Sequence, residues 1–233
     1  MAAAPRTMTD DLRRLPGLAT PALLLAALAG PPAFVVVADR LVGAAPSLGV
    51  QVVSQLIYCA MAGAVVWGVV HLERLPLRSI GVRRPDWTTV LSAALIVVAG
   101  LCLQALVVAP LAKSADAERL DAALRRLASL PPWFRVFVGI TGGAVEETLY
   151  RGYAIERLAA VTGRWWLAGA IAAVAFTLAH VPAWGARYAL TADLFAGVLL
   201  TLLYLWRRDL VANILAHSTS LVLAMLTLNV RAH

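Results

Sequence analysis

Long apolar runs separated by short polar gaps restrict what this chain can fold into. Each run approaches the length of about 20 residues that an α-helix needs to cross a bilayer, at a rise of about 1.5 Å per residue. The runs lie at residues 18–38, 48–70, 88–109, 133–150, 165–182, 189–206 and 210–229. This pattern predicts an all-α fold, a polytopic membrane helical bundle of about seven transmembrane helices.

The composition and the placement of charge favour the same fold. Hydrophobic residues make up 61% of the chain and charged residues 14%, whereas soluble domains are about half apolar and about a quarter charged. The net charge of +7 comes mainly from arginines in the gaps between apolar runs. Because these bases form no stripe, we expect membrane lipid and no nucleic acid as a partner. Their distribution favours an inside N-terminus and an outside C-terminus.

The chain divides into three expected parts. Residues 1–17 form a polar N-terminal segment. Residues 18–130 are expected to hold the first transmembrane helices and, near residue 120, an amphipathic surface helix whose leucines have helical spacing. Pro31 and Pro32 are expected to kink or break the first helix. Residues 131–233 are expected to form the core that carries the candidate site.

Ionisable side chains within the apolar runs are the second strong signal. A charged residue at the centre of a membrane helix costs about 2.5–3.5 kcal/mol on insertion scales, so such residues are usually functional. The residues concerned are Glu146, Glu147, His180, Asp193 and His217. The two glutamates and two histidines come from three runs, and we expect them to converge on one site. We interpret Asp193 as a structural residue that pairs with Arg187.

The adjacent glutamates cannot share one role, because neighbours on a helix point about 100° apart. Glu147 precedes Arg151 by four residues, which is the favourable order for an ion pair, and we predict that this pair braces the helix. Glu146 has no local base and suits a general base. A buried brace in which both acids are structural is the alternative. Gly142 and Gly143 predict close packing of another helix.

The two histidines become candidate catalytic residues when they are considered together with Glu146. His180 shares a helix face with Phe176, and His217 shares one with Asn213. Each histidine alone fits a helix-packing residue as well as a catalytic one. Combined with Glu146, they supply what peptide hydrolysis needs, namely an activated water, an oxyanion donor and a proton for the leaving amine. Glu146, His180 and His217 could also ligate a divalent metal such as zinc, and both possibilities stay open.

These motifs resemble those of the CPBP family, which comprises type II CAAX prenyl endopeptidases and bacteriocin-processing or bacteriocin-immunity membrane proteins. The matching motifs are Glu146-Glu147-x-x-x-Arg151, Phe176-x-x-x-His180 and, in the third motif, His217. The resemblance implies an all-helical intramembrane peptidase in which Glu146 and His180 activate a water and His217 lies near the oxyanion. It also implies that Glu147 and Arg151 support the site, with or without a metal.

One position departs from the family pattern. The third motif usually has an asparagine four residues after its histidine, and this chain has Leu221 there. Asn213 or Ser220 is the candidate to replace that donor. We predict an intramembrane endopeptidase of the bacterial cell (inner) membrane that cleaves a membrane-associated peptide or protein substrate, prenylated or with a leader peptide. The alternatives are a non-catalytic immunity or scaffold protein of the same family and a proton-coupled transporter.

Overall fold

The computed structural model describes residues 18–42, 46–111 and 117–227. The predicted polar segment 1–17 lies outside the described residues. Every regular element in the described part of the chain is helical, which confirms the all-α prediction. The helices and their bounds are α2 (Ala19–Val42), α3 (Leu48–His71), η1 (Leu77–Ile80), α4 (Trp87–Leu111), α5 (Ala117–Ala128), α6 (Pro132–Glu146), η2 (Glu147–Ile155), α7 (Glu156–Thr162), α8 (Trp165–Trp184), α9 (Ala186–Tyr188), η3 (Ala189–Asp193), α10 (Leu194–Arg207) and α11 (Leu210–Thr227).

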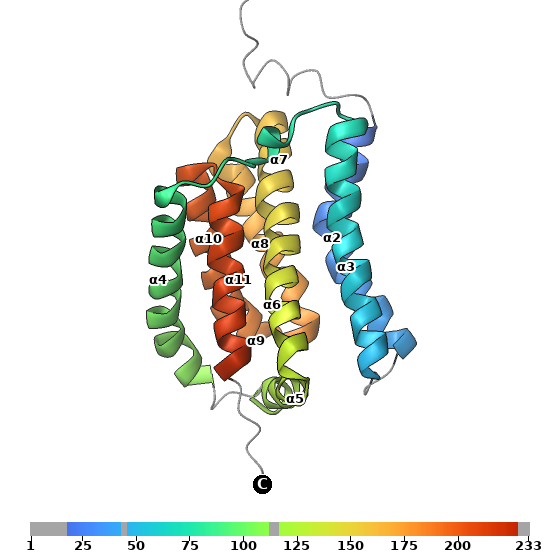
Figure 1. Cartoon of the computed structure of the whole chain (residues 1–233), viewed down its shortest axis with the longest axis vertical. Coiled ribbons are helices and arrows are strands. Elements are labelled where there is room, and N and C mark those ends of the chain that lie inside the picture. Colours follow the sequence, from blue (N-terminus) through green and yellow to red (C-terminus); the bar gives the residue numbers. More distant parts are fainter. Residues whose placement is uncertain (1–17, 43–45, 112–116, 228–233) are drawn as a thin grey trace, which may run out of the picture.

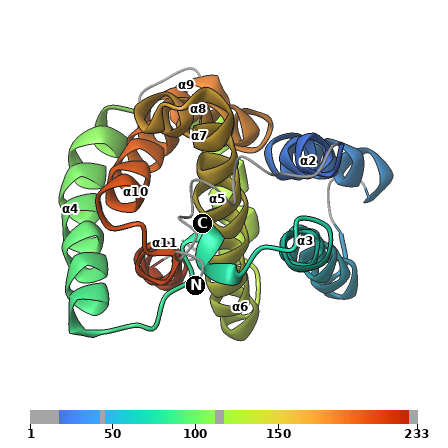
Figure 2. The ribbon, with the colours of Figure 1, turned by 90° about the horizontal axis from the view of Figure 1, so that it is seen from above.

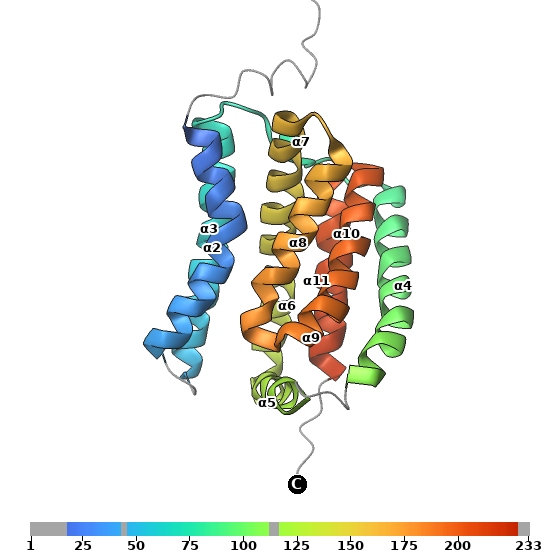
Figure 3. The same ribbon diagram turned by 180° about the vertical axis from the view of Figure 1, so that it is seen from behind.

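The long helices run side by side along the longest axis of the molecule (Figures 1 and 3). Helix α6, the π-helix η2 and helix α7 follow one another without a break and form one long element, here called the α6–α7 rod. Helix α7 lies at one end of the bundle and α5 at the other, and we name the two ends after them. Helix α2 begins at the α7 end and α11 ends at the α5 end, in keeping with termini on opposite sides.

The exterior of the bundle matches the interior of a bilayer. In the described part of the chain, five helices are long and apolar enough to cross a membrane. They are Ala19–Leu41, Leu48–His71, Trp165–Trp184, Ala186–Arg207 and Leu210–Thr227. Helix α4 and the α6–α7 rod run alongside them. Large apolar side chains are exposed on the outside, among them Leu25, Leu56, Leu95, Val98, Val174 and Leu202. Contact with lipid satisfies this surface, so the protein is an integral membrane protein.

Two local expectations meet different outcomes. Helix α2 continues through Pro31 and Pro32, so the expected break is absent; membrane helices tolerate proline because their surroundings compensate for the lost hydrogen bond. The expected surface helix is α5, which lies at the end of the bundle (Figure 1) and carries an exposed ion pair between Asp121 and Arg125.

Outside the spans, hydrogen bonds from Thr88 and Thr89 hold the pKa of Asp86 below its usual range.

Helices α2 and α3 form a pair beside the rest of the bundle (Figure 2). A buried polar cluster, here called the clasp, ties this pair to the α6–α7 rod at the α7 end. Its members are Thr20, Glu73, Ser79, Tyr153 and Arg157. The Arg157 guanidinium lies 2.6 Å and 2.9 Å from Glu73 Oε2, and both side chains are fully buried. Tyr153 and Thr20 donate to Glu73 Oε1 over 2.8 Å and 2.9 Å. The clasp thus fixes where the pair meets the rod.

Candidate active site

Close packing between α6 and α11 brings the site together. A Cβ atom added at Gly143 would lie 2.5 Å from Ser218 Oγ and 2.6 Å from the Ser218 amide nitrogen, and one at Gly139 would lie 3.0 Å from the Val222 amide nitrogen. Contacts this short force the neighbouring atoms to shift, so an added side chain at either position would push α11 away from α6. The predicted close approach is present, but Gly139 and Gly143 make it; Gly142 meets only Leu221, at an ordinary 3.7 Å.

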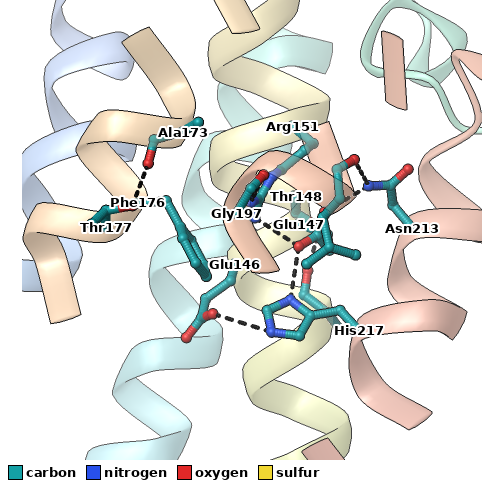
Figure 4. A network of polar contacts seen from close by, with 12 residues as sticks. Glu146, Glu147, Thr148, Arg151, Ala173, Phe176, Thr177, Gly197, Asn213 and His217 are labelled. Carbon is teal, nitrogen blue, oxygen red and sulfur yellow. Dashed lines mark hydrogen bonds and ion pairs between the residues drawn. The ribbon is translucent and has the colours of Figure 1, made fainter. Parts of the chain in front are cut away.

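Three predicted side chains meet at one carboxylate oxygen (Figure 4 shows two of them). Glu146 Oε2 lies 3.9 Å from Nε2 of His180 on α8 and 3.8 Å from Nε2 of His217 on α11. All three side chains are mostly buried, with exposed fractions of 15%, 19% and 8%. The structure therefore brings Glu146, His180 and His217 into one group. Helix α8 continues past Pro182 to Trp184, so His180 lies within the helix and not at its end.

Both imidazoles are oriented by a hydrogen bond at Nδ1. His180 Nδ1 lies 2.8 Å from the Phe176 carbonyl oxygen, and His217 Nδ1 lies 2.7 Å from Glu147 Oε1. A carbonyl and an ionised carboxylate only accept hydrogen bonds, so each Nδ1 carries the hydrogen. In the neutral imidazole the lone pair is then on Nε2. Both lone pairs face Glu146 Oε2.

Glu147 plays a different part from its neighbour. Its Oε1 accepts from Arg151 Nη1 over 2.7 Å and from His217, and its Oε2 accepts from the Asn213 amide over 2.9 Å. Glu147 and Arg151 are completely buried. Arg151 also donates to the Gly197 carbonyl over 3.1 Å. The predicted Glu147–Arg151 brace is present, and it also holds His217.

Asn213 supports the site from behind. Its amide donates to Glu147 Oε2 and, over 2.8 Å, to the Leu200 carbonyl, which uses both amide hydrogens. Asn213 lies on the far side of Glu147 from Glu146 (Figure 4). The expectation that Asn213 takes over the oxyanion donor is therefore wrong for this geometry, because no hydrogen is left to donate. Its role as a supporting residue of Glu147 fits.

The aromatic side chain of Phe176 packs against the site. The Phe176 ring lies 4.5 Å from the His180 ring and 6.0 Å from the His217 ring, centroid to centroid. The Arg151 guanidinium carbon lies 4.3 Å from the same ring centroid, within cation–π range. Phe176 thus packs on both histidines and on the arginine of the brace.

Three further polar residues surround the group, namely Tyr58, Tyr150 and Asp193. The Tyr58 hydroxyl donates to Glu146 Oε1 over 3.4 Å. The Tyr150 hydroxyl and Asp193 Oδ2 are buried without a hydrogen-bond partner among the described residues. Both are close enough to Glu146 to interact with it electrostatically. The sequence singled out Asp193 by its place within an apolar run, but as a structural residue, and it gave no signal for the two tyrosines.

The predicted metal ligands can be tested by their spacing. Two ligands of a tetrahedral zinc ion at about 2.0–2.1 Å lie about 3.4 Å apart, whereas the Nε2–Oε2 separations here are 3.8 Å and 3.9 Å. Among residues 18–42, 46–111 and 117–227, no group of three or more His, Cys, Asp or Glu side chains is arranged to hold a metal ion. Glu146, His180 and His217 do not fit zinc in this arrangement.

The fold and the site define an all-helical integral membrane protein with a carboxylate–histidine centre inside the bundle. Residues 128–222 match the family model described as type II CAAX prenyl endopeptidase Rce1-like, which assigns this part of the chain to the CPBP family. Proteins of this family are generally proteases that act on peptides in a membrane. Comparison with curated proteins and with solved structures finds no match.

Proposed function

We propose that this protein is an intramembrane endopeptidase of the cell membrane, in which Glu146, His180 and His217 hydrolyse a peptide bond of a membrane-associated substrate. The observation that carries the proposal is the meeting of one carboxylate oxygen and two imidazole nitrogens at 3.8–3.9 Å. The family match, which is to a CAAX-type endopeptidase model, supports the same reaction class.

The spacing of these atoms suits a water molecule. Hydrogen bonds between oxygen or nitrogen atoms are about 2.8 Å long, so a water can lie between Glu146 Oε2 and the Nε2 atoms. Such a water donates its two hydrogens to Glu146 Oε2 and His180 Nε2, and His217 Nε2 donates to it when that ring is imidazolium. Glu146 takes a proton from this water while the water oxygen attacks the scissile carbonyl carbon. His180 orients the water through Nε2. General-base assistance of this kind contributes about 100- to 10,000-fold to a rate.

The second half of the reaction uses the same groups. The carbonyl oxygen becomes an oxyanion, and His217 stabilises it when Nε2 carries a proton, that is, as imidazolium. Glu147 holds Nδ1 of that ring and so fixes its direction. Glu146 returns its proton to the amide nitrogen and the C–N bond breaks. The products are a carboxylic acid and an amine, which become a carboxylate and an ammonium group when the acid proton passes to the amine.

The experiment is a peptidase assay on the purified protein in detergent or nanodiscs. Suitable probes are a farnesylated C-terminal CAAX peptide, its unprenylated copy and a leader peptide. Glu146→Gln should lower the rate about 100- to 10,000-fold and leave the melting temperature unchanged, because the amide keeps the shape of the side chain. Parallel reactions with a chelator measure metal dependence. Equal rates for Glu146→Gln and wild type would rule out Glu146 as the general base.

A non-catalytic role as an immunity or scaffold protein is the second candidate, and Leu221 favours it. The Leu221 side chain lies against Gly142, one helical turn from Glu146, where the family usually has an asparagine. An apolar side chain donates no hydrogen bond to an oxyanion. Absence of cleavage of all three probes by wild type, together with recovery of cleavage in Leu221→Asn, would favour this second candidate.

A further inference from the structure

Tyr58 lies on α3, outside the segment that matches the family model, and its side chain reaches the proposed base. Its hydroxyl donates to Glu146 Oε1 over 3.4 Å. Hydrogen bonds of catalytic groups are often long in the absence of substrate and shorten when it binds. This contact joins the α2–α3 pair to the reacting carboxylate.

Two contacts place Tyr58, one made by a neighbouring residue of α3 and one by the Tyr58 ring itself. About one turn away on α3, Gln55 Nε2 donates to Thr141 Oγ1 of α6 over 2.7 Å. Phe34 of α2 is stacked against Tyr58, with ring centroids 6.3 Å apart and an interplanar angle of 17°. The phenol is therefore packed from α2 and tied to α6 through α3.

The two oxygens of Glu146 consequently have different partners. Oε1 receives the Tyr58 hydroxyl, whereas Oε2 faces both Nε2 atoms. The terminal torsion of a glutamate has a broad, roughly two-fold profile, so the carboxylate by itself can turn in either direction. A donor on one oxygen removes this freedom.

We propose that Tyr58 is a positioning residue that turns the Glu146 carboxylate so that Oε2 receives the proton of the attacking water. This inference rests on the proposed function. Its consequence is that the working site extends beyond residues 128–222 and includes a residue of the α2–α3 pair.

The test compares Tyr58→Phe with Tyr153→Phe, a matched control that removes a phenol hydroxyl from the clasp. A hydrogen bond to a charged group contributes about 1.5–3 kcal/mol, which corresponds to about a 10- to 150-fold change. Tyr58→Phe should lower kcat by about this factor with little change in KM, because substrate binding does not use the hydroxyl. Phenylalanine keeps the stacking on Phe34, so the melting temperature should stay near that of wild type. Tyr153→Phe should lower the melting temperature and keep kcat.

Glu146→Gln in the same series separates the two proposals. Wild-type kcat in Tyr58→Phe with an inactive Glu146→Gln would overturn the role of Tyr58 and leave the base in place. Activity in Glu146→Gln would overturn the proposed function.

An infrared measurement on protein with isotope-labelled glutamate needs no turnover. The carboxylate band that Glu146→Gln removes should shift in Tyr58→Phe and stay in place in Tyr153→Phe. An unshifted band in Tyr58→Phe would contradict the inference even when no probe is cleaved.

Discussion

The clasp and the candidate site are two buried polar clusters on the same rod, and they are built in opposite ways. In the clasp, all three guanidinium nitrogens of Arg157 have partners, at distances of 2.6–3.2 Å. In the site, the contacts of Glu146 are 3.4, 3.8 and 3.9 Å long. The clasp is closed to solvent, whereas the Glu146 side chain keeps 15% of its surface exposed.

The short contacts of the clasp suit a structural role, and the longer contacts of Glu146 suit a catalytic one. A buried charge without partners is costly, so a cluster whose function is structural satisfies every atom. A base must exchange its partners during a reaction, and loose contacts allow water to enter. Glu147 lies between the two cases, because it belongs to the site but is bound as tightly as Glu73. The adjacent residues Glu146 and Glu147 therefore differ, because Glu146 has loose contacts and Glu147 has tight ones.

The largest expected effect on stability comes from breaking the clasp. Glu73→Gln leaves Arg157 without its counter-charge, and removal of one partner of a buried pair costs about 3–5 kcal/mol in soluble proteins. Thermal or denaturant unfolding in detergent measures this loss, while kcat per folded molecule should be kept. Asp121→Asn on α5 is the control, because its pair with Arg125 is exposed and surface pairs contribute about 0–1 kcal/mol. Similar stability of both variants would show that the buried Glu73–Arg157 pair contributes no more than the exposed Asp121–Arg125 pair.

Asn213→Ala should have a smaller effect and behave like a clasp variant, although it lies in the site. It removes the hydrogen bond to the Glu147 carboxylate, which is worth about 1.5–3 kcal/mol. Unfolding measurements should show this loss, and turnover per folded molecule should fall by less than about tenfold. A fall of 100-fold or more, which is typical of a lost oxyanion donor, with unchanged stability would return Asn213 to the catalytic role that its contacts exclude.

Gly143→Ala tests the helix contact beneath the site and should have the smallest effect on stability. The added methyl group meets the Ser218 backbone, and overpacking costs about 1–3 kcal/mol. Because α11 carries His217, turnover should fall as the helices separate. Gly142→Ala is the matched control, since its methyl group makes only ordinary contact with Leu221. Equal melting temperatures and rates for the two variants would show that the close approach is dispensable.

Much of the fold could be predicted from the sequence, because apolar length alone specifies membrane helices. The predicted break of α2 at Pro31 and Pro32 is absent. A proline shows that one backbone hydrogen bond is lost, but it does not show how the surrounding residues compensate for the loss. Of the two glycines predicted to allow close packing, Gly143 does so and Gly142 does not, whereas Gly139 was not predicted. Which of Gly139, Gly142 and Gly143 faces α11 depends on the rotation of α6, and periodicity does not fix that rotation within an apolar run.

The site was predictable where spacing along one helix decides contacts, and less so between helices. The Glu147–Arg151 pair follows from a separation of four residues. Asn213 was correctly placed on the face of His217, but its amide turns toward a carboxylate on another helix, which no local pattern encodes. Tyr58 is nearly ninety residues from Glu146 along the chain, and a tyrosine in an apolar run has many ordinary explanations. Whether Glu146, His180 and His217 catalyse hydrolysis stays a prediction for the assays above.

The position of the clasp gives α3 the mechanics of a lever arm. Glu73 holds the helix immediately after its last residue, His71, and Tyr58 lies thirteen residues away from that end, or about 20 Å at about 1.5 Å per residue. Tilting a rigid rod of that length by about 5° displaces its far part by about 2 Å, which is enough to open the 3.4 Å contact with Glu146. The Gln55–Thr141 hydrogen bond, three residues from Tyr58, resists such a tilt, so variants of the clasp alone are expected to keep Tyr58 on Glu146.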